Sequence, residues 1–596
     1  MGSRAIRGRV IDEGDRPISG LVILAHGNYI WPFNQQLLGR TITDDEGKYS
    51  ISYSPNKYMQ LLGQAPDITI TILDRTGTRE LAMTDKFRHV NDDALNVPAI
   101  MVPRASAEGM AATLGGLNPS RLTRNNDAEV LIDGMSAFAS MVAAIEKAQY
   151  TIHILQLSFS PDLIAIFTGG EIPSCATRPK DVLAQKLLEA NQRGVKVRIL
   201  LNENLFAPST VDELRDFFKN AGNNSVDVRP FPLVNNAVHA KSLTVDSQDN
   251  SRAEAFIIGS PFEQAYWDTP NHLIFDHRRG SGNPGIGNKP IHDVCIRLRG
   301  PAVAHVEETF VELWNFRSRE EHSADIIPPP KPLKAAGTQS VQVVRTFPAE
   351  ILPEITTGET GILEAYQRAI GNAQDFIYLE NQYFTSQTIS DALSQALSMN
   401  PGLQIILLLN ENTDVPAYKE LQNNLLGQLG SSHPRIGAFS LWRTGPSAES
   451  IELKQCYIHS KVAVIDDRWG TVGSANLDGI SMEAYIDIIE REKPPRNVEV
   501  NAVLFDGIQG EPATGKVAQM RRELWAEHLG LQHRALDSPP PGGWLELWRN
   551  AVRANIESLN DHQTMKGRIL PYSPELSARE QLISHGIDIS KFHVPD

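Results

Sequence analysis

Short runs of alternating apolar and polar residues mark the first hundred positions of the chain. Leu21–Ala25, Tyr49–Tyr53 and Ile68–Leu73 each have the pattern of a β-strand. Turn-forming sequences, including Asp15-Arg-Pro17 and Asp44-Asp-Glu-Gly47, separate such runs. Short strands at this spacing predict a small antiparallel β-sandwich over residues 1–105.

After this region, helical periodicity alternates with short apolar runs rich in β-branched residues. Asp181–Arg193 has the spacing of a helix and leads into a predicted strand at Val195–Leu201. This alternation is typical of an α/β fold in which helices cover a sheet in α/β/α layers.

The second part of the chain also repeats itself. Three segments recur in the same order, at an offset of 208 to 225 residues: Ala144–Ile154 as Ala369–Leu379, Ile199–Asn204 as Leu407–Asn412, and Glu312–Trp314 as Glu523–Trp525. The repeat predicts two homologous halves, 106–333 and 334–538, related by a pseudo-twofold axis and joined at the proline-rich stretch Pro328–Pro332. We expect residues 539–596 to form a short helical extension.

Composition narrows the function classes. The 596 residues carry a formal net charge of −15, with a sequence pI near 5.6, which argues against nucleic acid as the main partner. The three cysteines form no closely spaced metal-binding pattern. No apolar run is long enough for a secretion signal or a bilayer span. We therefore expect a soluble protein, cytoplasmic or exported, that meets membranes only peripherally.

Each half carries the same polar motif at a corresponding place. The first half has His239-Ala-Lys241 with Asp246 five residues after the lysine, followed by Gly259-Ser260. The second half has its own copy: His459-Ser-Lys461, Asp466 and Gly473-Ser474-Ala-Asn476. One such match could arise by chance, but two copies inside an internal duplication are a strong signal.

The spacing favours a phosphate site. In a strand, residues i and i+2 share a face, so each histidine and its lysine point the same way. Two lysines can stabilise the charge on a phosphoryl group, while one imidazole attacks phosphorus and the other protonates the leaving oxygen. We expect the residues of the glycine–serine turns to contact the phosphate: Ser260, Ser474 and Asn476. A lysine beside each histidine disfavours a bound cation, so we predict no metal ligand among the motif residues.

The chain resembles the phospholipase D superfamily over about residues 120–535. The resemblance is carried by these motifs together with the segments Tyr378–Phe384 and His292–Ala302. The resemblance implies that His239 is the nucleophile and His459 the general acid and base. It also implies that an acidic residue orients each histidine, and we assign Asp293 to His239 and Glu499 to His459. Asp246 and Asp466 would then be structural. The first motif departs from the family pattern, because Phe262 stands where a polar phosphate contact is common and leaves Asn476 without a counterpart.

The resemblance implies a phospholipase D that hydrolyses the distal phosphodiester of glycerophospholipids through a phosphohistidine, with transphosphatidylation to alcohols. We expect a monomer that acts on phospholipid surfaces, accepts alcohols, binds no nucleic acid and needs no cofactor for its chemistry, although calcium can aid interfacial docking. The alternatives are a phosphatidyltransferase of the cardiolipin-synthase type, a metal-independent nuclease and a non-enzymatic lipid-binding protein. Synthases of that type normally carry N-terminal membrane helices.

The N-terminal region has a resemblance of its own. Its opening Gly8-Arg-Val-Ile-Asp12, with Pro17–Gly20 and Thr43–Tyr49, resembles transthyretin-like or carboxypeptidase-regulatory-like domains. A calcium-binding C2-type sandwich is the alternative, with Asp92 and Asp93 among its possible ligands. Between the first motif and Asp293, three aromatic residues either rim the site and enter a bilayer surface or simply pack: Tyr266, Trp267 and Phe275.

Overall fold

The computed structural model describes most of the chain. The described residues are 4–11, 17–18, 20–28, 36–44, 46–54, 65–73, 80–102, 107–116, 120–167, 181–204, 210–233, 237–280, 282, 287–349, 351–353, 355–430, 433–446, 451–483, 485–486, 492–493, 496–507, 514–572 and 574–593.

The N-terminal region is all-β where it is described. One sheet has the order β4-β1-β7, with β8 also on β1, and a second has the order β3-β2-β5-β6. The strands are β1 (Arg4–Ile11), β2 (Val22–Asn28), β3 (Gln36–Ile42), β4 (Lys48–Tyr53), β5 (Asp67–Leu73), β6 (Glu80–Met83), β7 (Ala94–Asn96) and β8 (Ile100–Met101).

Both N-terminal sheets contribute to one hydrophobic cluster. Every second residue of β4 is buried (Tyr49, Ile51 and Tyr53), and these side chains join Ile70 and Ile72 of the other sheet. The predicted all-β region is therefore confirmed, while its resemblance to transthyretin-like domains stays a prediction. Asp92 and Asp93 are exposed, and neither belongs to a group of three or more potential metal ligands among the described residues.

The first half is built on a sheet of seven described strands. Their order is β9-β17-β15-β14-β10-β11-β12, antiparallel from β9 to β10 and parallel beyond it. The strands are β9 (Leu122–Ile132), β10 (Thr151–Gln156), β11 (Lys196–Asn204), β12 (Asp227–Leu233), β14 (Ser242–Val245), β15 (Glu254–Ile258) and β17 (Val294–Arg299).

The second half repeats this topology strand for strand. The order β18-β29-β26-β25-β20-β21-β22 has the same sequence of antiparallel and parallel neighbours. The strands are β18 (Gln339–Phe347), β20 (Phe376–Asn381), β21 (Gln404–Leu409), β22 (Ile436–Pro446), β25 (Lys461–Ile465), β26 (Trp469–Gly473) and β29 (Asn497–Phe505). The predicted duplication is confirmed.

The two sheets are joined edge to edge, because β9 pairs antiparallel with β18. Short strands also cross between the halves. β13 (Ala237–Val238) runs parallel to β29 of the second half, and β16 (Ile291–His292) runs parallel to β24 (Tyr457–Ile458). Each short strand precedes a residue that the sequence analysis singled out.

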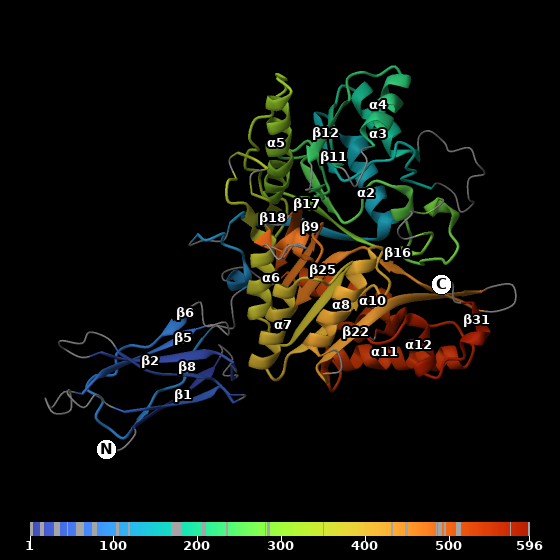
Figure 1. The fold of residues 1–596 in the computed structure, drawn as a ribbon. Helices are drawn as coiled ribbons and strands as arrows, with labels where there is room; N and C mark the ends of the chain where they lie inside the picture. Colours follow the sequence, from blue (N-terminus) through green and yellow to red (C-terminus); the bar gives the residue numbers. More distant parts are fainter. Residues whose placement is uncertain are drawn as a thin grey trace. The chain divides into compact units, whose positions relative to one another are not determined.

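Helices cover both faces of the first sheet (Figure 1). Side chains of α2 (Asp133–Lys147), α3 (Leu183–Gln192) and α4 (Val211–Asn220) share one core with Ile199 and Leu201. The residue between these two, Leu200, joins the opposite core with α5 (Ala302–Glu320). This alternation produces the predicted α/β/α layers. None of the described helices is both long and apolar enough to cross a membrane.

The remaining α-helices that the structure describes belong to the second half and the tail. They are α6 (Gly361–Gly371), α7 (Gln387–Met399), α8 (Pro416–Leu429), α9 (Gly479–Met482), α10 (Lys516–Leu529), α11 (Gly543–Asn560) and α12 (Ala578–Ser584).

The tail does more than extend the chain. It is helical, as expected, but β30 (Ile569–Pro571) also pairs with β22, so it adds a strand to the second sheet. Trp548 of α11 is fully buried in the core that the two halves share. The predicted boundary at residue 538 therefore cuts through one packed unit, because the second sheet buries its last strand under the tail.

Candidate active site

Each motif lies where one short strand ends and the next begins. His239 follows β13, and Lys241 immediately precedes β14; His459 likewise follows β24, and Lys461 is the first residue of β25. Each lysine donates a hydrogen bond to the backbone oxygen of its own motif histidine, at 2.8 Å for Lys241. Both lysine side chains are buried. Histidine and lysine thus share one side of the chain, as the i, i+2 spacing predicted.

An asparagine at the end of a parallel strand fixes the start of each motif. The side-chain oxygen of Asn202 accepts from the amide of Val238 at 2.9 Å, and that of Asn410 accepts from Ile458 at 2.8 Å. The sequence analysis found these asparagines as part of the repeat but gave them no role. These asparagines stand at matching positions in the two copies, and that match was the signal that could have identified their role.

The carboxylates orient the histidines of the opposite half. Nδ1 of His239 lies 2.8 Å from Oε1 of Glu499. Nδ1 of His459 lies 3.1 Å from Oδ2 of Asp293. The assignment of Asp293 to His239 and of Glu499 to His459 was therefore wrong, although each of these carboxylates does contact a motif histidine.

Strand exchange between the halves explains the correction. β13 pairs with β29 so that Val238 lies opposite Val498, which places His239 next to Glu499. In the same way β16 pairs with β24, and the amide of His459 donates to the backbone oxygen of His292 at 2.8 Å. Each motif histidine therefore receives its carboxylate from the sister half.

The serines of the two glycine–serine turns hold these carboxylates. The Ser474 hydroxyl donates to Oε2 of Glu499 at 2.6 Å, and the Ser260 hydroxyl donates to Asp293. A side chain at Gly259 would overlap the Asp293 carboxylate, so glycine is required for this close approach. The serine hydroxyls thus position the carboxylates, whereas a direct contact of either serine with phosphate stays a prediction.

Burial sets the protonation of the two histidines. It lowers the pKa of His239 below its ordinary value, with the Glu499 charge opposing the shift and both motif lysines adding to it. It lowers the pKa of His459 to about 3, and the charges of Lys461 and Lys241 act in the same direction. Both imidazoles are therefore neutral near pH 7 in the free site. Because each lysine acts on the histidine of the other half, the two motifs share one site.

The lysines and carboxylates carry the charge of this site. Burial lowers the pKa of Lys241 to about 7 and that of Lys461 to about 8, while Glu499 and Asp293 partly restore them. Burial alone would raise the pKa of Asp293, but the hydrogen bond and charge of His459 bring it below its ordinary value. His239 has the same effect on the pKa of Glu499. An arriving anion would keep both lysines protonated.

The turn after the first motif is one residue shorter than its counterpart. Phe262 forms a bridge with Phe159, and Leu477 forms the corresponding bridge with Phe384. Phe262 therefore occupies the place of Leu477, in the core, and not the place of Asn476 that the sequence analysis gave it. The side-chain oxygen of Asn476 is buried and has no hydrogen-bond partner among the described residues, so it is available to a ligand.

Asp246 and Asp466 hold backbone at the far end of each motif strand. Asp246 accepts from the amides of residues 149–151, and Asp466 accepts from Phe376. Both have positive φ, 47° and 55°. Their contacts are the structural ones expected of them.

Three further side chains border the second motif. Oε1 of Gln382 accepts from the Lys461 ammonium at 2.9 Å, and the edge of the Tyr266 ring packs against His459 with centroids 4.8 Å apart. Glu380 is buried behind the motif, where the Ser460 hydroxyl donates to it. Of the other two aromatics, Trp267 is buried, as the packing interpretation predicted, and Phe275 is 64% exposed.

Comparison with known proteins matches both halves to one superfamily. A family described as "Cardiolipin synthase, PLD-like domain" matches residues 141–261 and 366–506, and one described as "Phospholipase D" matches residues 445–596. A crystal structure of phosphatidylserine synthase from Haemophilus influenzae Rd KW20 has a TM-score of 0.45 and 13% identity over 66% of this chain and 85% of that chain.

The similar sequences carry two kinds of name. Phospholipase D1 of Schizosaccharomyces pombe is 24% identical over 59% of this chain and 32% of its own length. Cardiolipin synthase of Listeria welshimeri is 25% identical over 68% of this chain and 73% of its own length. Phospholipase D alpha 1 of Nicotiana tabacum is 25% identical over 49% of each. The chain thus spans about a third to a half of the two phospholipases.

The family matches cover both histidine–lysine motifs, and both motifs meet in one buried site with exchanged carboxylates. The chain therefore contains domains of the phospholipase D superfamily, whose members are phosphodiesterases and phosphotransferases.

Proposed function

We propose that this protein is a phospholipase D that cleaves the distal phosphodiester of glycerophospholipids to phosphatidic acid and the head-group alcohol. The observation that carries the proposal is the exchanged pair of histidine–carboxylate contacts. His239 and His459 each present Nε2 to the site, because Nδ1 is held by a carboxylate. Two buried lysines beside them supply positive charge for a phosphodiester.

In the first step, Nε2 of His239 attacks phosphorus and forms a P–N bond while the P–O bond to the head group breaks. His459 donates its Nε2 proton to the leaving oxygen, so the head group departs as a neutral alcohol. His459 must be protonated for this step, although its pKa in the free site is about 3. The negative charge of the bound phosphodiester raises that pKa, so the acid forms only with substrate present.

In the second step, His459 is neutral and removes a proton from water, whose oxygen attacks phosphorus and breaks the P–N bond. An alcohol in place of water produces transphosphatidylation by the same route. Glu499 stabilises the positive charge that His239 carries as a phosphohistidine, because its carboxylate lies 2.8 Å from Nδ1. Lys241 and Lys461 neutralise the non-bridging oxygens in both steps.

We further propose that this chemistry needs no metal, that a monomer suffices and that calcium acts only on docking to the lipid surface. Imidazole and ammonium groups already supply the nucleophile, the acid and the charge stabilisation that a catalytic metal would provide. The site lies within one chain, since both halves contribute to it.

The test is an assay on phosphatidylcholine and phosphatidylethanolamine vesicles with free calcium held low by EGTA. We expect phosphatidic acid, and phosphatidylethanol when ethanol is added. Labelling with a phospholipid radioactive at phosphorus, quenched in alkaline detergent because a P–N bond is acid-labile, should trap a phosphoenzyme in the wild type and none in His239→Ala. A folded wild-type protein that releases no phosphatidic acid from any of these lipids would contradict the proposal.

A phosphatidyltransferase of the cardiolipin-synthase type is the second candidate. The family description that matches both halves and the relatives from Listeria favour it. The same phosphohistidine would then be captured by the hydroxyl of a second phosphatidylglycerol. Vesicles of phosphatidylglycerol distinguish the two functions, because a synthase releases cardiolipin and glycerol whereas a hydrolase releases phosphatidic acid. Cleavage of plasmid DNA in the same buffer would instead indicate a nuclease.

A further inference from the structure

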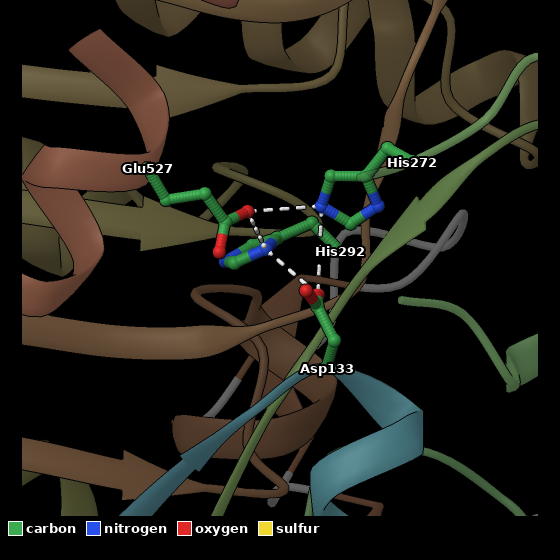
Figure 2. Close-up of side chains that lie close together, drawn as sticks. All are labelled: Asp133, His272, His292 and Glu527. Atoms are coloured by element: carbon green, nitrogen blue, oxygen red, sulfur yellow. Dashed lines mark hydrogen bonds and ion pairs between the residues drawn. The ribbon is translucent and has the colours of Figure 1, made fainter. Parts of the chain in front are cut away.

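Three buried side chains and one partly buried side chain converge next to the strand that leads to Asp293 (Figure 2). They come from segments far apart in the sequence: Asp133 begins α2, His272 lies five residues after Trp267, His292 lies on β16, and Glu527 lies on α10. One nitrogen or oxygen from each lies within 4.8 Å of all the others. None of the four belongs to the histidine–lysine motifs.

Four of the six distances between these atoms are close to the edge of a small tetrahedron, and the other two are below 4.8 Å. Nε2 of His272 lies 3.5 Å from Oδ1 of Asp133 and 2.9 Å from Oε1 of Glu527. Nδ1 of His292 lies 3.2 Å and 3.3 Å from the same two oxygens. Ligands about 2.0–2.1 Å from a central zinc ion are separated by about 3.3 Å in tetrahedral geometry. The four atoms thus enclose a space of the right size for such an ion.

Hydrogen bonds and ion pairs satisfy this cluster only in part. Both carboxylate oxygens of Asp133 and both ring nitrogens of His292 are buried without a well-aligned hydrogen bond to a described residue, although His292 lies 3.2 Å from Asp133 and 2.8 Å from Glu380. Nε2 of His272 does lie within hydrogen-bond distance of Glu527, at 2.9 Å. Asp133 is 1% exposed and His292 is fully buried, and both side chains point into the cluster (Figure 2). A buried carboxylate without a hydrogen bond is costly, and a cation at the centre would remove that cost.

A second layer of contacts orients the ligands. Nδ1 of His272 lies 3.2 Å from Oδ2 of Asp268, which leaves Nε2 for the centre. Nε2 of His292 lies 2.8 Å from Oε1 of Glu380, which leaves Nδ1 for the centre. Metal-binding histidines characteristically have a carboxylate behind the ring in this way. Arg568 donates at 2.5 Å to Oε1 of Glu527, the same oxygen that faces the cluster, and so fixes its position while sharing its charge.

We propose that Asp133, His272, His292 and Glu527 form a structural zinc site. Two imidazole nitrogens and two carboxylate oxygens are a common tetrahedral ligand set for zinc, whereas calcium and magnesium prefer sites built from oxygen alone. The two negative charges of Asp133 and Glu527 balance a divalent ion. All four positions are filled by protein, which is typical of structural sites and leaves no place for a metal-bound water.

A neighbouring group of potential ligands does not have these properties. His292, Glu380 and His528 also lie close together. Glu380, however, already accepts hydrogen bonds from the hydroxyls of Tyr378 and Ser460 and lies 3.1 Å from Nε2 of His528. Its oxygens are satisfied, so this group supports the first cluster as an outer layer and is not a second metal site.

The zinc site would join both halves beside the catalytic site. Asp133 donates its amide to the backbone oxygen of Asp293 at 2.8 Å, and His292 directly precedes Asp293 in the chain. Glu527 brings in the second half. A metal here would fix the strand that carries the carboxylate of His459.

Metal content tests the proposal without reference to activity. The full-length wild type, purified with zinc present and then gel-filtered, should contain about one zinc per chain, and Co²⁺ exchanged into the site should show the strong visible absorption of a tetrahedral ion. His272→Ala and Asp133→Asn should each lose the metal. His153→Ala is the matched control, because His153 is equally buried and lies 2.7 Å from Glu307 but belongs to no such cluster among the described residues.

If a variant fails to fold, measurements on the wild type alone still test the proposed zinc site. Removal of the ion with a strong chelator under mild denaturation should lower the midpoint of thermal unfolding, and zinc should restore it. Wild-type protein without zinc or cobalt after saturation, or with a thermal midpoint that neither chelator nor zinc changes, would overturn the proposal. The cluster would then be a metal-free network of imidazolium and carboxylate groups.

Discussion

The two halves present the same pair of residues from the same strand order, but they hold their histidines differently. Nδ1 of His239 lies 2.8 Å from Glu499. Nδ1 of His459 lies 3.1 Å from Asp293 and also 3.2 Å from the Lys461 ammonium. A carboxylate favours positive charge on an imidazole, whereas an ammonium group opposes it.

This difference separates two roles that the motifs alone do not distinguish. The histidine that becomes a phosphohistidine carries a lasting positive charge and benefits from the closer carboxylate, which favours His239. The histidine that gives up a proton and takes it back needs a charged form that is easily lost, which favours His459 beside Lys461. The duplication supplied two similar motifs. The other groups that contact each histidine give the two histidines different electrostatic surroundings.

The largest expected effect is the loss of either histidine. His239→Ala should lower kcat by about 10⁴-fold or more and abolish the acid-labile, alkali-stable phosphoenzyme, because it removes the nitrogen that attacks phosphorus. His459→Ala should lower kcat by about 10²–10⁴-fold with natural lipids. With an activated phosphodiester, whose leaving group needs no acid, the same variant should accumulate phosphoenzyme. Full labelling of His239→Ala would reverse the roles of the halves.

The next effect tests the exchange of carboxylates. Glu499→Gln and Asp293→Asn should each lower kcat by about 10²–10³-fold, because each leaves a histidine without its orienting charge. Rapid-quench kinetics should show that Glu499→Gln slows formation of the phosphoenzyme, whereas Asp293→Asn slows both its formation and its breakdown, because His459 acts in both steps. Asp249→Asn, in a turn after the first motif, is the matched control and should change neither rate. Slower breakdown in Glu499→Gln, with formation unaffected, would contradict the cross-half pairing.

A smaller effect compares Asn476 with Phe262. Asn476→Ala should lower kcat/KM by about 10–100-fold through loss of the hydrogen bond that its side-chain NH2 group would donate to the charged phosphate, with little change in stability. Phe262→Ala should leave kcat of the folded enzyme unchanged but lower the free energy of unfolding by about 3–5 kcal/mol, because its ring is buried against Phe138 and Phe159. Steady-state kinetics and denaturant unfolding measure the two effects. Equal loss of activity in both variants would contradict the difference in register.

The smallest effect is the pH dependence. The pKa of Lys241 is about 7 and that of Lys461 about 8 in the free site, so both lose their charge as the pH rises through these values. We expect kcat/KM to fall at least about tenfold for each pH unit above 8. On the acid side, the lowered pKa values of both histidines keep them neutral, so activity should persist below pH 6.5. A pH profile that stays flat to pH 10 would show that the pKa values of the two lysines are not lowered.

The sequence predicted what depends on local pattern and internal repetition. Period-two alternation of apolar and polar residues predicted strands such as β4 and β5, and the repeated motif predicted His239, Lys241 and their counterparts. The partner of each carboxylate was predicted wrongly, because it depends on whether β13 pairs with its own half or with β29. The sequences of β13 and β29 do not show which half β13 pairs with.

Two other features could not be predicted from the sequence, for similar reasons. A one-residue difference in turn length moves Phe262 from a phosphate contact to the core, and aligning the two copies by their Gly-Ser pairs conceals it. The cluster of Asp133, His272, His292 and Glu527 joins residues up to almost four hundred positions apart. No spacing rule connects them, since their proximity results from the packing of α2, β16 and α10.

The exchanged carboxylates also determine when the enzyme becomes active during its synthesis. A ribosome completes the nucleophile, both lysines, the second histidine and Asp293 before it reaches Glu499. Until β29 is made and lies beside β13, the nascent polypeptide holds its nucleophile without a counter-charge. A chain interrupted before Glu499 therefore lacks the complete site, and we expect the proposed activity only when the second half has folded against the first.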